Sequence, residues 1–161
     1  MWRAGDKGLW SWPLLAAALS RSDFLLGDTV TDGRTQDLVG LGLLPKLARA
    51  PRAWLLEHYD GLRSAILVLD GAVGDFNFAV RARDENIFSA QLYRPPAPGE
   101  HHFSQLAGVI EDFFRTGQTP WPLERNVLIA GLLETFGRPS THLNGRVLTP
   151  ELAIGYGKSD K

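Results

Sequence analysis

The hydrophobic period of this chain changes at residue 52, and this change constrains the fold more than any other feature. From residue 52 to 93, β-branched, aromatic and aliphatic residues come in short runs with a period of two. Asp60-Gly61 separates two of these runs, 53–59 and 62–69, and tolerates the positive φ angles of a two-residue type I′ turn. This part of the sequence predicts an antiparallel meander that begins with a hairpin.

The runs differ in which of their faces are apolar. Residues 62–69 are apolar on both faces, which predicts a central strand covered on both sides. Residues 76–83 alternate between apolar side chains such as Phe78 and polar ones such as Asn77, which predicts that one face is wetter. A turn at 84–86 leads to a last strand of the meander, 88–93.

Helices are predicted on either side of the meander. Residues 10–22 form the first, with Ser11 as N-cap. The proline-rich segment 95–99 ends the sheet, and an apolar stripe from Phe103 to Phe114 then predicts a helix that docks on a sheet face. A helix over 122–136 is apolar around much of its girth and is predicted to be buried. Short strands are predicted at 37–41 and 146–148.

These elements predict one α+β domain over residues 1–161, with an open, mainly antiparallel sheet and helices packed on one face. A chain of 161 residues can bury roughly 70% of the surface that its unfolded form exposes, so it can fold without disulfides or a structural metal.

Composition narrows the classes of function. A net charge of -1 gives no basic surface for nucleic acid. The lack of cysteine excludes disulfides and thiolate chemistry. No apolar run approaches the ~20 residues of a membrane span, and the first residues do not read as a secretory signal. A cytoplasmic location is therefore expected.

Four histidines are the first candidates for chemistry. His101 and His102 are adjacent and so do not face one site, which argues against a metal centre. His102 is a candidate for proton transfer or simply lies near a helix start. His58 is a candidate ligand-binding residue or a hydrogen-bonded structural residue on a strand.

A second group of candidates follows the polar side of the meander. Asp75, Asn77, Arg81 and Gln91 would present donors and acceptors to a hydroxyl-rich ligand; the alternative is a solvated sheet face. Serine nucleophiles lack the Gly-x-Ser-x-Gly elbow. Glycines at 40 and 42, and at 71 and 74, do not form the strand-Gly-x-Gly-x-x-Gly-helix fingerprint of dinucleotide binding. No cofactor is expected in this chain.

Several segments resemble one enzyme superfamily. They are GLWSWPLLAAALSRS, TDGRTQDLV, WLLEHYDGLRSAILVLDGAVGDFNFAVRA, HFSQLAGVIEDFFRTGQTPWPLERNVLIAGLLETF and GRVLTPELAIGY. They are similar to the C-terminal half of oxidoreductases of the glucose-fructose oxidoreductase/inositol dehydrogenase/MocA (Gfo/Idh/MocA) superfamily. The resemblance implies an α+β domain whose open sheet face packs against another subunit, sugar or polyol substrates, and a separate Rossmann domain that binds NAD(P).

The chain also departs from that pattern. The superfamily's Glu-Lys-Pro signature is absent, and the helix over 10–21 has alanines and leucines where an acid and a base would be expected. No catalytic residue is therefore assigned. The leading hypothesis is a substrate-side and oligomerisation domain that is not catalytic by itself and that is completed by a Rossmann-domain partner. The alternatives are an independent small sugar- or polyol-binding protein or enzyme that uses the polar sheet face, and a purely structural dimerisation domain.

Overall fold

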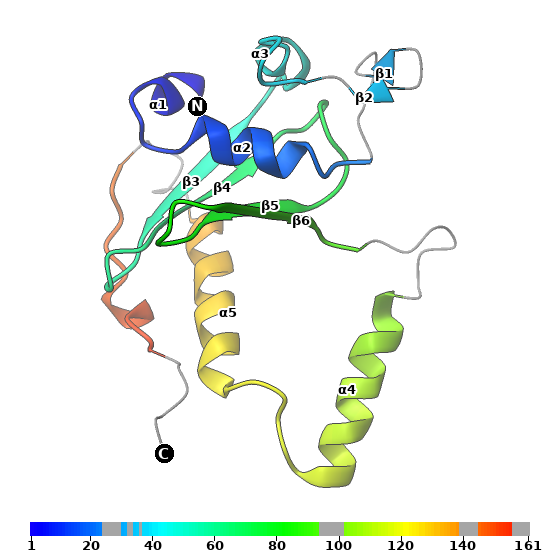
Figure 1. Cartoon of the computed structure of the whole chain (residues 1–161). Coiled ribbons are helices and arrows are strands. Elements are labelled where there is room, and N and C mark those ends of the chain that lie inside the picture. The colour runs from blue at the N-terminus through cyan, green and yellow to red at the C-terminus, as the bar shows by residue number, and fades with distance from the viewer. Residues whose placement is uncertain (24–29, 32–33, 36, 94–101, 139–144, 156–161) are drawn as a thin grey trace. The chain divides into compact units, whose positions relative to one another are not determined.

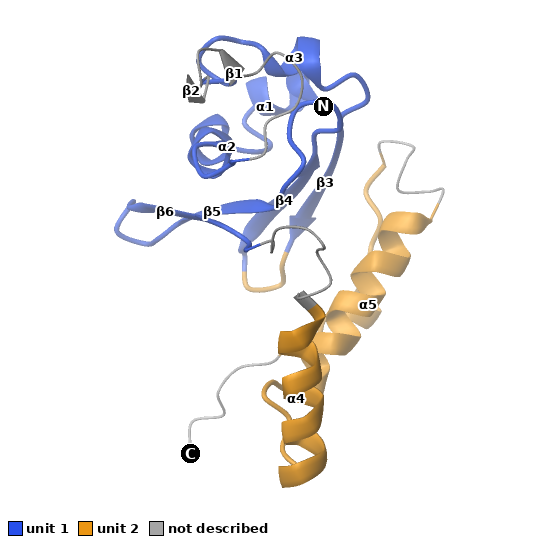
Figure 2. Cartoon of the chain, turned by 90° about the vertical axis from the view of Figure 1, so that its right-hand side faces the viewer, with its two compact units in different colours: residues 1–57, 61–94 blue, residues 58–60, 95–161 orange. Residues whose placement is uncertain are grey.

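The computed structural model describes residues 1–23, 30–31, 34–35, 37–93, 102–138 and 145–155 (Figure 1). The chain divides into two compact units (Figure 2). Unit 1 comprises residues 1–57 and 61–94, and unit 2 comprises residues 58–60 and 95–161. Each unit is described by itself. That the chain forms one domain stays a prediction.

The fold class is α+β, as the sequence predicts, and every described ladder is antiparallel. The strands pair as three two-stranded ladders: β1 (Val30–Thr31) with β2 (Arg34–Thr35), β3 (Arg52–Glu57) with β4 (Arg63–Val68), and β5 (Asn77–Arg81) with β6 (Ile87–Gln91). None of the described helices is long and apolar enough to cross a bilayer.

The core of unit 1 gathers around its N-terminal helices, α1 (Trp2–Asp6) and α2 (Trp12–Leu19). Ser11 caps α2 as predicted, because its hydroxyl accepts the amide proton of Leu14. The buried hydrophobic side chains of the cluster are Trp10, Leu15, Leu19, Leu38, Leu44, Ala48, Leu69 and Ala72. Burial of these groups is the main source of stability that unit 1 supplies for itself.

The first hairpin of the meander is confirmed, with residues 52–57 paired to 63–68. Its turn differs from the prediction: Glu57 pairs with Arg63, so five residues connect the strands, and Gly61 has a φ of 86°. The prediction that residues 62–69 are covered on both sides is wrong. Within the described residues β4 pairs only with β3, and its first four residues are exposed.

The second hairpin turns where the sequence predicts. Glu85 adopts a positive φ of 64°, and Ala82 donates its amide proton to the carbonyl of Asn86. Helix α2 lies over one face of this hairpin and contacts both β5 and β6 (Figures 1 and 2). Packing by α2 therefore gives β5 and β6 one covered face.

Unit 2 contains two 15-residue helices, α4 (His102–Thr116) and α5 (Leu123–Gly137), and a short 3-10 helix, η3 (Pro150–Leu152), that contacts α5. From the connection between them, α4 and α5 splay apart (Figure 1). Both helices confirm the sequence prediction. Their predicted burial is wrong, because the apolar stripe of α4 is exposed and Thr135 is the only buried residue described in α5.

Both short strands predicted outside the meander are wrong. Residues 38–42 form turns, in which Leu41 donates to the carbonyl of Asp37 and Leu43 donates to that of Leu38. Residues 44–47 then form helix α3 (Leu44–Leu47). Residues 145–149 have no regular structure. Two or three apolar residues without a described neighbouring strand carry too little pairing energy to form a strand alone.

Candidate functional site

Within the described part of unit 1, the Asp75 carboxylate, which lies just before β5, accepts hydrogen bonds from four residues. It accepts hydrogen bonds from the Ser22 hydroxyl at 2.8 and 2.9 Å, from the Asn77 amide at 2.6 Å and from the Gln91 amide at 2.8 Å. The backbone amide of Asp23 donates a further bond at 3.2 Å. We call this set of five residues the Asp75 network.

The network forms because two chain segments meet. Ser22 and Asp23 follow the end of α2, whereas Asn77 and Gln91 are paired opposite each other on β5 and β6. The Gln91 amide also donates to the carboxylate of Asp23. Thus the network attaches the end of α2 to the hairpin that the helix covers.

Its electrostatics keep Asp75 ionised. Partial burial acts to raise the pKa of the Asp75 carboxyl, but the hydrogen bonds from Ser22, Gln91, Asn77 and the Asp23 amide together outweigh it. The pKa therefore lies below its ordinary value of 3.8. Hydrogen bonds donated to a carboxylate stabilise the charged form, which is the form the network requires.

The structure therefore brings together three of the six residues that the sequence selects as ligand-binding candidates: Asp75, Asn77 and Gln91. Their polar face does not lie open, because α2 covers it and Arg21 donates a further bond to Ser89 on β6 at 2.9 Å. In the described part of the chain, the side-chain oxygen of Asn77, Oδ1, is buried without a hydrogen-bond partner. The donors of Asn77 and Gln91 are used within the chain, so the arrangement is suited to positioning α2. Binding of a hydroxyl-rich ligand there stays a prediction.

The other three candidates lie elsewhere. Arg81, at the end of β5, pairs with Glu85 in the hairpin turn at 3.3 Å and is not part of the Asp75 network. His58 is half-buried directly after β3. His102 is the first residue of α4, and its side chain lies outside the described residues.

The turn that contains Gly40 is bonded to a group of the chain itself. Gly40 donates its amide proton to the Asp37 carboxylate at 2.8 Å, so this amide is already bonded to an anionic group of the chain. The helix that follows, α3, has only four residues, which is too short to supply the helix terminus of a pyrophosphate site. Among the described residues, no three His, Asp or Glu side chains form a group that could hold a metal ion.

The opposite face of the β5–β6 hairpin is apolar and exposed. Phe78 pairs with Ala90 and Val80 pairs with Phe88 on this face, and Phe76 and Leu92 extend it through a backbone hydrogen bond of 2.8 Å. The five large side chains of this apolar hairpin face are 45–68% exposed: Phe76, Phe78, Val80, Phe88 and Leu92. Helix α2 thus covers the polar face of the hairpin, and the apolar face is exposed.

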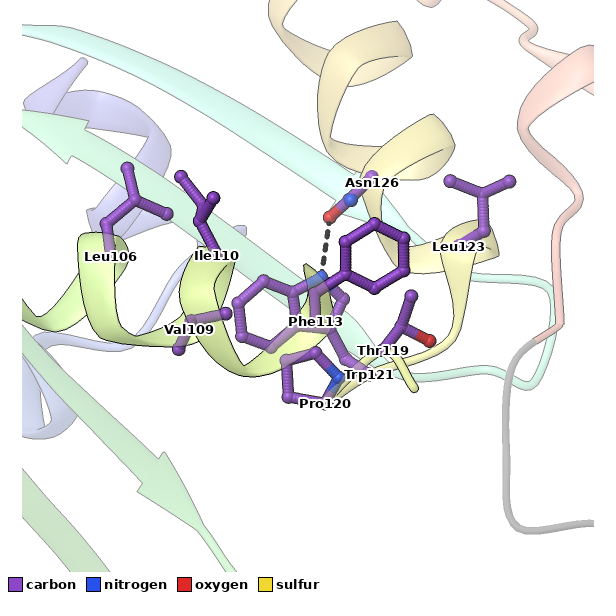
Figure 3. Close-up of a pocket in the computed structure, with 9 residues that line it drawn as sticks. All are labelled: Leu106, Val109, Ile110, Phe113, Thr119, Pro120, Trp121, Leu123 and Asn126. Carbon is purple, nitrogen blue, oxygen red and sulfur yellow. Dashed lines mark hydrogen bonds between the residues drawn. The ribbon is translucent and has the colours of Figure 1, made fainter. Parts of the chain in front are cut away.

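Unit 2 contains an apolar pocket of about 220 Å³ where α4 and α5 meet their connection (Figure 3). Trp121, one of its lining residues, donates its indole N–H to the Asn126 side chain at 3.0 Å, and the centroid of its ring lies 4.9 Å from the Arg125 guanidinium carbon. The lining side chains are Leu106, Val109, Ile110, Phe113, Thr119, Pro120, Trp121, Leu123 and Asn126. We call this cavity the Trp121 pocket.

Sequence reasoning missed Ser22, Asp23 and the Trp121 pocket. Ser22-Asp23 was expected only as the end of a helix, although two polar residues after an apolar helix could have indicated a bond to the neighbouring element. The pocket had no local signal, because its lining comes from two helices and their connection.

Comparisons with known protein families, curated proteins and solved structures find no match to this chain. The resemblance to the Gfo/Idh/MocA superfamily therefore stays a prediction.

Proposed function

We propose that this chain is an association module that binds a second copy of itself through the apolar hairpin face. One observation carries the proposal: α2 covers the polar face of the β5–β6 hairpin and leaves its large apolar side chains exposed. Contiguous exposed apolar surface marks interaction sites in soluble proteins.

The composition of the face favours a second copy. Its five large side chains carry no charge, so two such faces can meet without burying an unpaired ion. An isologous contact needs one self-complementary patch, which this face supplies. β5 and β6 pair through their edges, whereas the apolar side chains point to a face, so a contact on that face leaves the β5–β6 pairing intact.

The resemblance to the Gfo/Idh/MocA superfamily supports a further role for this module, as part of an enzyme. On that basis the module is the substrate-side half of an NAD(P)-dependent oxidoreductase that handles a sugar or polyol. A Rossmann-domain partner would supply the cofactor, since the sequence of this chain has no strand-Gly-x-Gly-x-x-Gly-helix fingerprint. The chain by itself is proposed to be inactive.

The association is tested by measuring the mass of the full chain in solution by light scattering over a range of concentrations. Val80→Asp places a charge at the centre of the apolar hairpin face and is expected to weaken association about tenfold or more. Leu148→Asp is the matched control, because Leu148 is exposed and lies in unit 2 outside any helix or strand. A monomeric wild type, or equal effects of the two variants, contradicts the proposal.

The absence of a dinucleotide site is tested separately. Titration of the full chain with NAD⁺ and with NADP⁺ in a calorimeter is expected to give no binding heat. Tight binding of either cofactor by the chain alone would contradict the division into a cofactor half and a substrate-side half.

A further inference from the structure

Helix α4 presents an apolar stripe to solvent. Its most exposed ring is Phe114, at 81%, and the stripe continues along the helix through Ile110 and Leu106. Glu111, Asp112 and Arg115 follow the other side, where Arg115 pairs with Asp112 at 2.7 Å. A helix with this division between faces normally lies against another apolar surface.

The Trp121 pocket is lined in part by this stripe, through Leu106 and Ile110, and is large enough for an aromatic ring. Its volume of about 220 Å³ exceeds the ~150 Å³ of an apolar cavity that binds benzene. Trp121 is held in place by its bond to Asn126 and by Arg125 over its ring, and both interactions lie within unit 2. The wall that Trp121 forms is therefore preorganised, which lowers the cost of binding.

Phe114 and the pocket lie next to each other. Phe113 lines the pocket, and its ring centroid is 5.7 Å from that of Phe114. Phe114 itself is not a lining residue, and it is 81% exposed. A projecting ring beside a ring-sized cavity is the arrangement that a two-fold contact needs, because each copy then supplies one of each.

We propose that the α4–α5 hairpin is a second self-association site, at which Phe114 of each copy inserts into the Trp121 pocket of the other. This site is separate from the apolar hairpin face of unit 1 and does not depend on it. The contact is isologous, with Phe114 as the anchor and the outer side chains of α4 and α5 around it.

The exposed apolar area of the two helices sets an upper limit on the contact. Nine large apolar side chains on the two helices are 41–81% exposed: Phe103, Leu106, Ile110, Phe113, Phe114, Leu123, Val127, Ile129 and Leu133. An aromatic side chain buries about 150–250 Å² and an aliphatic one less, so together they expose on the order of 800 Å² per copy, the size of a standard interface. One contact buries part of this area, because Val127 and Ile129 lie on different sides of α5.

The chain has no cysteine, so single cysteines report the contact directly. Full chains carrying only Phe114→Cys are mixed with full chains carrying only Thr119→Cys and treated with a short bis-maleimide. Because each chain has one thiol, a mixed product can form only between copies. The proposal predicts that this mixed product forms. In the control, Gln105→Cys, on the polar side of α4, replaces Phe114→Cys and should give little cross-linked product.

Mass measurements complete the test. In the Val80→Asp background, where the unit 1 face is disabled, the chain is expected to remain a dimer, and adding Phe114→Ala should weaken that dimer by about 30-fold. Ile110→Trp, which fills the pocket, should weaken it as well. Failure of Val80→Asp alone overturns only the hairpin-face proposal. Equal cross-linking from Phe114→Cys and Gln105→Cys, or a mass unchanged by Phe114→Ala, overturns the helix-hairpin site.

Discussion

The two units contain similar apolar residues but use them differently. Unit 1 holds all eight of the buried hydrophobic side chains found among the described residues, from Trp10 to Ala72. Unit 2 has two long helices rich in Phe, Leu, Ile and Val, yet its one described buried residue is Thr135. Apolar content is thus not the same as a core. A core also requires a second surface on which the apolar face can pack.

The difference assigns distinct roles to the units. Unit 1 stabilises itself through its core and through the Asp75 network, which attaches α2 to the β5–β6 hairpin. Unit 2 presents its helices and the Trp121 pocket to solvent. Substitutions in the core and in the Asp75 network should therefore change the stability of unit 1, whereas substitutions on the apolar hairpin face and on α4 should change association.

The largest loss of stability is expected from Leu44→Ala. Leu44 is 1% exposed in the unit 1 core, and removing a buried leucine side chain costs about 2–5 kcal/mol. Urea unfolding followed by hydrogen exchange should localise the loss to unit 1. Leu41→Ala is the control, since Leu41 is 62% exposed and should change the free energy of unfolding by less than about 0.5 kcal/mol. Equal effects would show that unit 1 lacks the core described.

A smaller loss is expected from Asp75→Asn. The substitution replaces a carboxylate that accepts bonds from Ser22, Asn77 and Gln91 with an amide that cannot accept all of them. Leaving buried donors unsatisfied costs about 1–3 kcal/mol. Asp70→Asn, at an exposed carboxylate 3.8 Å from Arg52, is the matched control and should cost less than about 1 kcal/mol. If both variants unfold alike, the network does not stabilise unit 1.

The same carboxylate predicts a dependence on pH. Because the folded-state pKa of Asp75 lies below 3.8, its stabilising contribution is fully present above pH 3.8 and is lost as the pH falls through the folded-state pKa. The difference in unfolding free energy between the wild type and Asp75→Asn should therefore shrink in acid. Urea titrations between about pH 5 and pH 2 measure it. A difference that stays constant over this range would place Asp75 outside any stabilising network.

The smallest effect is expected from Arg81→Ala. The sequence grouped Arg81 with Asp75, Asn77 and Gln91, but the structure pairs it with Glu85 in an exposed turn. Exposed ion pairs contribute about 0–1 kcal/mol. Thermal unfolding should show a loss in this range and no change in the acid dependence that Asp75 produces. A loss of stability as large as that caused by Asp75→Asn would show that Arg81 contributes to the Asp75 network.

The sequence by itself determined the local elements, because their signals are local. Ser11 capped the first helix as expected, the period-two runs formed two hairpins, and the stripe from Phe103 to Phe114 formed a helix. Each of these depends on residues only a few positions apart. The α+β class followed from the same patterns.

Only the tertiary structure decided which faces are covered. Alternation in the β5–β6 hairpin separated a polar from an apolar face, but packing of α2 made the polar face the covered one and brought Ser22 to Asp75, 53 positions away in the chain. In the same way, the apolar periodicity of α4 and α5 fixed their helical form while leaving their burial undecided. A periodic pattern shows that a face can be buried, whereas burial requires a partner surface, and that surface is supplied by residues distant in the sequence or by another chain.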